Sequence, residues 1–279
     1  MTDAPSPPSH RPTPRPRPEP VEMPSVRTRP GVAATVVLLA FAVGWFAPSL
    51  LTHAKAPSPV ASRAYMYGAW TLATLAAVRV LYGGGLRGAL RALGLAANPA
   101  PSVTMAFVAT LPMLVGFAAT ADEVHLSVGV VAGSALAPGF FEEVFFRGLA
   151  FVQLHRAARW GIVPAAAVPA VAFAAGHVGP SSDLAAAFGV FAVTFAGALW
   201  FAWIVVAWGF VLWPAVALHV FMNLWWSAFG AGATALGGVG ANLLRGATIA
   251  IATVWTIRHA RQRGRSPWPR GRLWRNRTA

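Results

Sequence analysis

Eight apolar segments, each of about the length needed to cross a membrane, follow one another along this chain. They cover approximately residues 31–51, 64–82, 102–121, 127–153, 160–178, 184–208, 211–229 and 241–257. The hydrocarbon core of a bilayer is about 30 Å thick, and a helix of about 20 apolar residues spans it. The sequence therefore predicts an all-α fold, a polytopic transmembrane helical bundle with about eight spans.

The composition excludes several other classes of protein. Hydrophobic residues make up 56% of the chain and charged residues 11%, whereas about a quarter of a soluble domain is charged. The net charge of +14 could indicate nucleic acid, but the arginines lie mainly near the chain ends and between apolar segments. Membrane orientation explains them better, so we expect a lipid bilayer and no nucleic acid as partner. Because the chain has no cysteine, catalysis by a thiol and thiolate metal sites are excluded.

The apolar segments divide the chain into three regions. Residues 1–30 are rich in proline and arginine and predict a disordered cytoplasmic arm. Residues 31–257 form the transmembrane bundle, with a polar core at about 135–226, and residues 258–279 form a basic cytoplasmic tail. The triplet 54–56 resembles a signal-peptide cleavage site. However, the arm before it is long, and the apolar segment is longer than the apolar region of a usual signal peptide, about 7–15 residues. An uncleaved anchor is therefore favoured.

Charged residues between the spans predict the orientation of the chain. Connections on one side of the membrane carry the basic residues Arg87, Arg91, Arg156, Arg159 and the run from Arg258 to Arg277. Connections on the other side carry the acidic residues Asp122, Glu123 and Asp183. Lys55 and Arg63 are basic residues that do not follow this division. The positive-inside rule then puts both termini in the cytoplasm. Residues 86–95 fit an interfacial helix or an ordinary loop. The abundance of arginine and alanine suggests a bacterial source, and hence a multi-pass protein of the inner membrane.

The first polar motif interrupts the fourth apolar segment. Glu142, Glu143 and Arg147 follow Pro138 and Gly139, which mark a helix start. Charged side chains at bilayer depth are costly and therefore indicate function by default. Helical spacing lets Glu143 reach Arg147, whereas Glu142 points about 100° away and stays available as a general base. The alternative is a structural ion pair beside a spare glutamate.

Two further motifs lie on two other predicted spans. Phe173 and His177 share one face of a helix rich in small residues, and His219 and Asn223 share a face of an apolar helix. Taken alone, each pair fits a polar clamp between helices as well as a catalytic role. One unpaired glutamate, two histidines and one asparagine on three spans could converge on a single polar cavity. Together they favour a catalytic site.

The three motifs, in this order, resemble those of the CPBP family of intramembrane proteases. That family includes the CAAX-processing Rce1-type endopeptidases and bacterial Abi proteins, and the similarity covers about residues 135–226. The resemblance implies that Glu142 activates the attacking water, with His177 and His219 as further site residues. It implies that Asn223 supports the oxyanion or a ligand. Glu143, Arg147 and Phe173 would support the site structurally.

The same residues allow two forms of hydrolysis. In one, Glu142, His177 and His219 bind a divalent metal, which the resemblance and the ligand chemistry predict to be zinc, with a coordination position open for water. In the other, Glu142 and His177 deprotonate water directly while His219 and Asn223 donate to the oxyanion. The sequence does not separate them.

The resulting prediction is an intramembrane endopeptidase that hydrolyses a peptide bond of a membrane-associated or lipidated protein. The alternative from another class is a non-catalytic binding protein, a scaffold or a bacteriocin-immunity-type protein that keeps the polar cluster. Transport is disfavoured, because no matching pair of Gly/Pro-interrupted segments occurs in the two halves of the chain. The substrate and the functions of both charged ends are not legible in the sequence.

Overall fold

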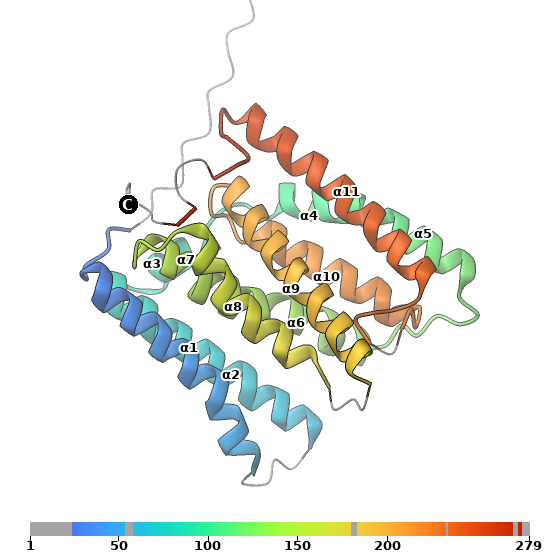
Figure 1. Cartoon of the computed structure of the whole chain (residues 1–279), viewed down its shortest axis with the longest axis horizontal. Coiled ribbons are helices and arrows are strands. Elements are labelled where there is room, and N and C mark those ends of the chain that lie inside the picture. Colours follow the sequence, from blue (N-terminus) through green and yellow to red (C-terminus); the bar gives the residue numbers. More distant parts are fainter. Residues whose placement is uncertain (1–23, 54–57, 180–182, 233, 270–272, 275–279) are drawn as a thin grey trace, which may run out of the picture.

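The structure, a computed structural model, describes residues 24–53, 58–179, 183–232, 234–269 and 273–274, and most of these residues are helical. No strand occurs within those ranges, so the predicted all-α class is confirmed (Figure 1). The elements are α1 (Pro30–His53), α2 (Pro59–Tyr82), α3 (Leu86–Ala92), α4 (Ala100–Ala109), α5 (Leu111–Thr120), η1 (Gly129–Leu136), α6 (Ala137–Glu142), η2 (Glu143–Phe151), α7 (Val152–Arg156), α8 (Ile162–His177), α9 (Leu184–Ala207), α10 (Trp213–Ala228) and α11 (Val239–Gln262).

Each of the eight predicted segments is helical, but fewer of them meet the length and hydropathy expected of a span. Three do so within the described residues: 30–48, 129–156 and 184–207. A fourth is added if α4 and α5, which meet at 41°, form one broken span. These long apolar helices indicate a membrane protein. The count of eight spans and the cytoplasmic location of both termini stay predictions.

Three predicted segments lie partly or wholly outside the described residues. The description leaves out residues 1–23 of the arm, the triplet 54–56, and residues 270–272 and 275–279 of the tail, whose first residues continue α11 to Gln262. The segment that fitted either an interfacial helix or a loop is helical as α3. Its position at a membrane surface stays a prediction.

The third and fourth predicted spans differ from simple helices for identifiable reasons. The third bends where Pro112 follows the start of α5, because proline lacks an N–H and its ring clashes with the carbonyl four residues before it. The fourth is one helical run in which α6 begins at Ala137, beside the predicted start at Pro138, but continues the π-helix η1. The second π-helix, η2, begins at Glu143. π-helical turns are frequent at functional sites.

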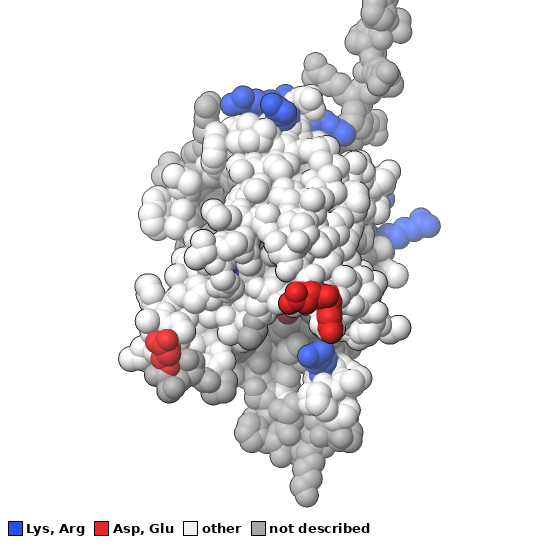
Figure 2. All heavy atoms as spheres, turned by 90° about the vertical axis from the view of Figure 1, so that its right-hand side faces the viewer, with Lys and Arg blue, Asp and Glu red and all other residues white. Residues whose placement is uncertain are grey.

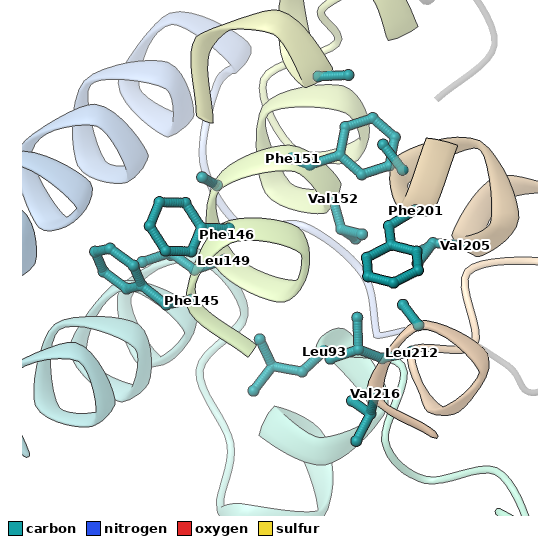
Figure 3. Packing of buried hydrophobic residues seen from close by; sticks show 14 of the residues in the cluster. Leu93, Phe145, Phe146, Leu149, Phe151, Val152, Phe201, Val205, Leu212 and Val216 are labelled. Atoms are coloured by element: carbon teal, nitrogen blue, oxygen red, sulfur yellow. The ribbon is translucent and has the colours of Figure 1, made fainter. Parts of the chain in front are cut away.

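Aromatic packing fixes the helix that carries the two glutamates. The ring of Phe145 stacks on Trp70 of α2 at 4.8 Å and on Phe41 of α1 at 5.0 Å. Figure 3 shows Phe145 and Phe146 on one side of η2, with Phe151 on the side that faces Phe201 of α9. This helix is therefore clamped from both sides, which holds its polar residues in a defined orientation.

A polar network anchors the other end of the same helix. The Tyr82 hydroxyl donates to Gln153 Oε1 at 2.5 Å, and Gln153 Nε2 donates to the carbonyls of Ala92 at 3.0 Å and Gly148 at 2.8 Å. Gln153 is fully buried. Because buried polar groups are costly unless they are paired, this network fixes how α2, α3 and η2 meet.

The C-terminal segment holds the start of α8. The amides of Gly161 and Val163 donate to the carbonyls of Trp274 and Leu273 at 3.1 and 3.0 Å. A helix N-terminus leaves its first amides without partners inside the helix, and these two carbonyls supply partners. The helix that ends at His177 is therefore tied to the bundle at its opposite end.

Charged side chains are unevenly distributed over the surface. Figure 2 shows a face that is mostly uncharged, with basic side chains gathered at one end and acidic ones, beside one basic side chain, toward the other. Large apolar side chains such as Leu39, Phe46 and Leu72 are exposed on the outer helices. Lipid would cover such a surface, since an exposed apolar patch of this extent is unusual for a soluble monomer.

Candidate active site

Glu143 and Arg147 form a buried ion pair, as their spacing predicts. Arg147 Nη1 donates to Glu143 Oε1 at 2.9 Å, and both side chains are almost completely buried. Breaking such a pair leaves one charge buried without compensation, which costs about 3–5 kcal/mol. The pair therefore holds η2 in place.

Two aromatic rings complete the surroundings of Arg147. Its guanidinium carbon lies 4.5 Å from the ring centroid of Phe173 on α8 and 5.4 Å from that of Phe201 on α9. A cation above an aromatic ring gains about 0.5–2 kcal/mol, and most where water is excluded. Arg147 of η2 thus contacts rings of α8 and α9. The contact with Phe173 is a way in which this ring can support the site.

His219 lies between the two glutamates. Its Nδ1 is 2.8 Å from Glu143 Oε1, and its Nε2 is 3.7 Å from Glu142 Oε2. Because the Glu143 carboxylate accepts from Arg147 and has no proton to give when ionised, Nδ1 of His219 carries the hydrogen. A carboxylate behind a histidine fixes the ring and its tautomer. The sequence predicted that Glu143 holds its own helix in place. The contact with His219 shows that Glu143 also orients a side chain of α10.

A glycine makes this contact between two helices possible. A Cβ at Gly139 would lie 2.5 Å from Val220 Cγ2 and 2.9 Å from the Val220 backbone nitrogen. Val220 directly follows His219, so α6 and α10 approach each other at the point where the glutamates meet the histidine. Small residues allow such close approach of helix backbones.

His177 presents one ring nitrogen to the site. Its Nδ1 is 2.7 Å from the carbonyl oxygen of Phe173 in the preceding turn, and the two rings are 4.3 Å apart. A carbonyl only accepts, so Nδ1 is the donor, and Nε2 of the neutral ring is a free acceptor. Phe173 and His177 share one helix face, as their spacing predicts.

Asn223 of α10 contacts the helical run that carries the two glutamates. Its Nδ2 donates to the carbonyl of Ser134 in η1 at 3.3 Å. The amide oxygen and the second amide hydrogen of Asn223 remain for other partners.

One cavity of about 600 Å³ brings the motifs together. Glu142, His177, His219 and Asn223 all line it, together with Arg147 and Phe173, so the structure brings the three motifs to one cavity, although most of its wall is apolar and not polar as predicted. Glu143 lies buried behind His219. The remaining lining residues come mainly from α9, α10 and α11: Pro138, Val193, Thr194, Ala196, Gly197, Trp200, Phe201, Met222, Ala235, Arg245 and Ile249. This volume is within the usual range of ligand sites, about 300–1,000 Å³.

Three polar atoms of the cluster have no hydrogen-bond partner in the protein. They are Glu142 Oε2, Glu143 Oε2 and Arg147 Nη2, and each is buried. Buried polar atoms are almost always paired, so a water or another polar group is expected to pair with these atoms. Of the three atoms, only Glu142 Oε2 belongs to a side chain that both lines the cavity and can act as a base.

Arg245 of α11 lines the same cavity and was missed by sequence reasoning. A signal was present, because a single arginine inside the predicted span 241–257 is as unusual as the first motif. The contributions of α9 had no such signal, since Trp200 and Phe201 are ordinary residues of an apolar helix.

The predicted zinc ligands are only partly brought together. Glu142 and His219 are neighbours, but no group of three His, Asp or Glu side chains within the described residues could hold a metal ion. His177 shares the cavity without completing a three-ligand set. Glu142, His177 and His219 as arranged therefore do not fit the tetrahedral site that zinc requires.

The fold and this cavity define a class: a helical membrane protein with a charged and polar site inside its bundle. Residues 124–225 match the family described as type II CAAX prenyl endopeptidase Rce1-like. The chain therefore carries an Rce1-like domain, which covers the region of the three motifs. The match supports intramembrane proteolysis of the CAAX type in general terms. Comparison with curated proteins and with solved structures gives no match.

Proposed function

We propose that the protein is an intramembrane endopeptidase in which Glu142 activates the water that attacks a peptide bond. The observation that carries the proposal is Glu142, whose side chain lines the cavity and whose buried Oε2 receives no hydrogen bond from the protein. A general base must be within hydrogen-bond reach of the proton that it removes, and a water that reaches this oxygen displaces no protein hydrogen bond. The Rce1-like match gives the reaction class.

The mechanism needs Glu142 ionised and a hydrogen on both ring nitrogens of His219. The geometry offers each nitrogen a carboxylate, because Nδ1 lies 2.8 Å from Glu143 Oε1 and Nε2 lies 3.7 Å from Glu142 Oε2. Glu142 is then a base, and His219 Nε2 is a donor.

The remaining steps follow from the same groups. Glu142 takes a proton from water as the water oxygen attacks the peptide carbonyl, and the Nε2 acceptor of His177 offers a second position for that proton. His219 Nε2 and the spare amide hydrogen of Asn223 donate to the oxyanion that forms. Collapse of the tetrahedral intermediate breaks the C–N bond, and Glu142 returns the proton to the departing amine. Atoms and charge balance over the cycle, and Glu142 is regenerated.

The substrate class follows from the surroundings of the site. Most of the cavity wall is apolar, with Val193, Met222 and Ile249 among its residues. An apolar segment of a membrane-associated or lipidated protein suits such a wall and could enter from the bilayer. We further propose that the protein is a multi-pass protein of the bacterial inner membrane.

The test compares host cells that carry the wild-type chain, Glu142→Gln or Glu123→Gln at equal expression. New termini in membrane and secreted proteins are quantified by mass spectrometry. Glu123→Gln is the matched control, because Glu123 is an exposed carboxylate outside the cavity. We expect one or more shortened proteins with wild type and Glu123→Gln that are absent with Glu142→Gln. Identical termini in all three strains would contradict proteolysis and favour the binding or immunity function.

A further inference from the structure

Arg245 carries a positive charge into the cavity at a position that the proposed mechanism does not use. It lies on α11, whereas the proposed catalytic residues lie on α6, α8 and α10. The other guanidinium of the cavity, Arg147, is neutralised by Glu143. Arg245 has no carboxylate partner among the described residues.

The guanidinium of Arg245 is held in one orientation. Nη1 donates to the carbonyl of Ala235 at 2.6 Å, and Nη2 donates to the carbonyl of Leu236 at 3.4 Å and to the side-chain oxygen of Asn242. Its carbon lies 5.1 Å from the ring centroid of Trp226. These partners are neutral, so they fix the group without cancelling its charge. Arginine has five N–H donors, and the three contacts leave others for a ligand.

A fixed and uncompensated cation in a mostly apolar cavity is a recognition site for an anion. Leaving such a charge unpaired is costly, and an oxyanion that forms a charge-assisted hydrogen bond offsets the cost. We propose that Arg245 forms an oxyanion subsite of the proposed catalytic cavity and binds a carboxylate or phosphate group of the ligand that occupies it. This inference rests on the proposed function for the identity of the ligand, a peptide.

Two sources offer this chemistry. A peptide supplies a carboxylate at its C-terminus or on an acidic side chain, and a phospholipid supplies a phosphate in its headgroup. In either case Arg245 would fix one end of the bound molecule relative to Glu142, because both side chains line the same cavity. A peptide anchored in this way would present a preferred bond to the base.

Binding can be measured separately from cleavage. The full chain with Glu142→Gln is placed in nanodiscs of zwitterionic lipid and titrated with a fluorescent apolar tetrapeptide, either as the free acid or as the C-terminal amide. We expect the acid to bind about tenfold or more tightly than the amide, the scale of one charge-assisted contact. Adding Arg245→Gln should bring the two affinities within about twofold, and Arg245→Lys should keep part of the preference.

Arg258→Gln is the matched control, because Arg258 lies on the same helix but outside this cavity. It should leave the acid preference unchanged. A merely structural role of Arg245 would weaken acid and amide equally, so the ratio of the two affinities is the decisive readout. Equal affinities in a parent protein that retains no lipid through Arg245, or a preference that survives Arg245→Gln, would overturn the proposal.

Anionic nanodiscs distinguish the two sources. If phosphatidylglycerol abolishes the acid preference and native mass spectrometry shows a lipid retained by the parent but not by Arg245→Gln, headgroup phosphate is the ligand. If the preference persists, the peptide carboxylate is the ligand. If the purified protein prefers the acid but cells show no cleavage that depends on Glu142, the proposed function alone is contradicted. Cleavage with neither an acid preference nor a lipid retained through Arg245 would contradict the subsite alone.

Discussion

Glu143 Oε1 lies 2.8 Å from His219 Nδ1 and 2.9 Å from Arg147 Nη1, so one carboxylate oxygen orients a histidine and neutralises an arginine. The two glutamates of the first motif therefore differ in what depends on them. Glu143 serves the structure and the orientation of His219, whereas Glu142 Oε2 has no hydrogen-bond partner in the protein and only a 3.7 Å contact with His219 Nε2. Substitution of each by the nearly isosteric glutamine separates these roles.

Glu143→Gln should destabilise the protein, and Glu142→Gln should not. Removing the Glu143 charge leaves Arg147 buried without compensation, which costs about 3–5 kcal/mol. Thermal unfolding of the purified protein measures the difference, with Glu123→Gln as the exposed control. Both variants of the motif should lose proteolysis, but only Glu142→Gln at wild-type stability. Equal melting temperatures for Glu143→Gln and wild type would show that the buried pair does not hold η2.

Arg147→Lys should destabilise the bundle although it keeps the charge. Lysine does not reproduce the planar group that packs at 4.5 Å over Phe173 and reaches Glu143 at the same time. We expect a loss of about 1–2 kcal/mol, the scale of a desolvated cation–π contact. Arg91→Lys, at an exposed position of α3, is the control and should change stability by less than about 0.5 kcal/mol. A similar effect for the two variants would mean that the rings beside Arg147 contribute nothing specific.

Gly139→Ala should separate the helices that carry the site. The new methyl would clash with Val220, and relief of the clash moves α6 away from α10, which separates Glu142 from His219. Overpacking of this kind costs about 1–3 kcal/mol. The measurement is cleavage of a substrate found in the cellular comparison, together with the melting temperature. Gly68→Ala is the control, because a Cβ at Gly68 meets nothing within 4 Å. Full activity of Gly139→Ala would contradict the idea that this close approach sets the site geometry.

The sequence predicted what depends on spacing within one helix. The pairing of Glu143 with Arg147 and the shared face of Phe173 and His177 follow from helical periodicity. The contact between Glu143 and His219 does not, because it joins residues 76 positions apart and depends on Gly139 and Val220 at a crossing of two helices. Spacing within one helix also does not predict the π-helices that flank α6.

Convergence of three motifs predicted the cavity but not its full lining. Glu, His and Asn in apolar spans need partners, so their meeting was a physical expectation. Arg245 carried the same signal in a span that was assigned by hydropathy alone. The residues of α9 were out of reach, because their identity is typical of any apolar helix and only tertiary packing brings them to the site.

Removal of metal ions by a chelator should leave proteolysis intact if the three predicted ligands lie in the active protein as they do in this structure. Zinc holds nitrogen ligands at about 2.0–2.1 Å, so three tetrahedral ligand atoms lie within about 3.5 Å of one another. The Glu142 and His219 atoms, at 3.7 Å, come near this spacing, but His177 does not complete the group. We expect purified protein dialysed against a chelator to keep full activity and to contain far less than one zinc per chain. Loss of activity that added Zn²⁺ restores, and Mg²⁺ does not, would instead support the three-ligand site and require His177 to move toward the other two.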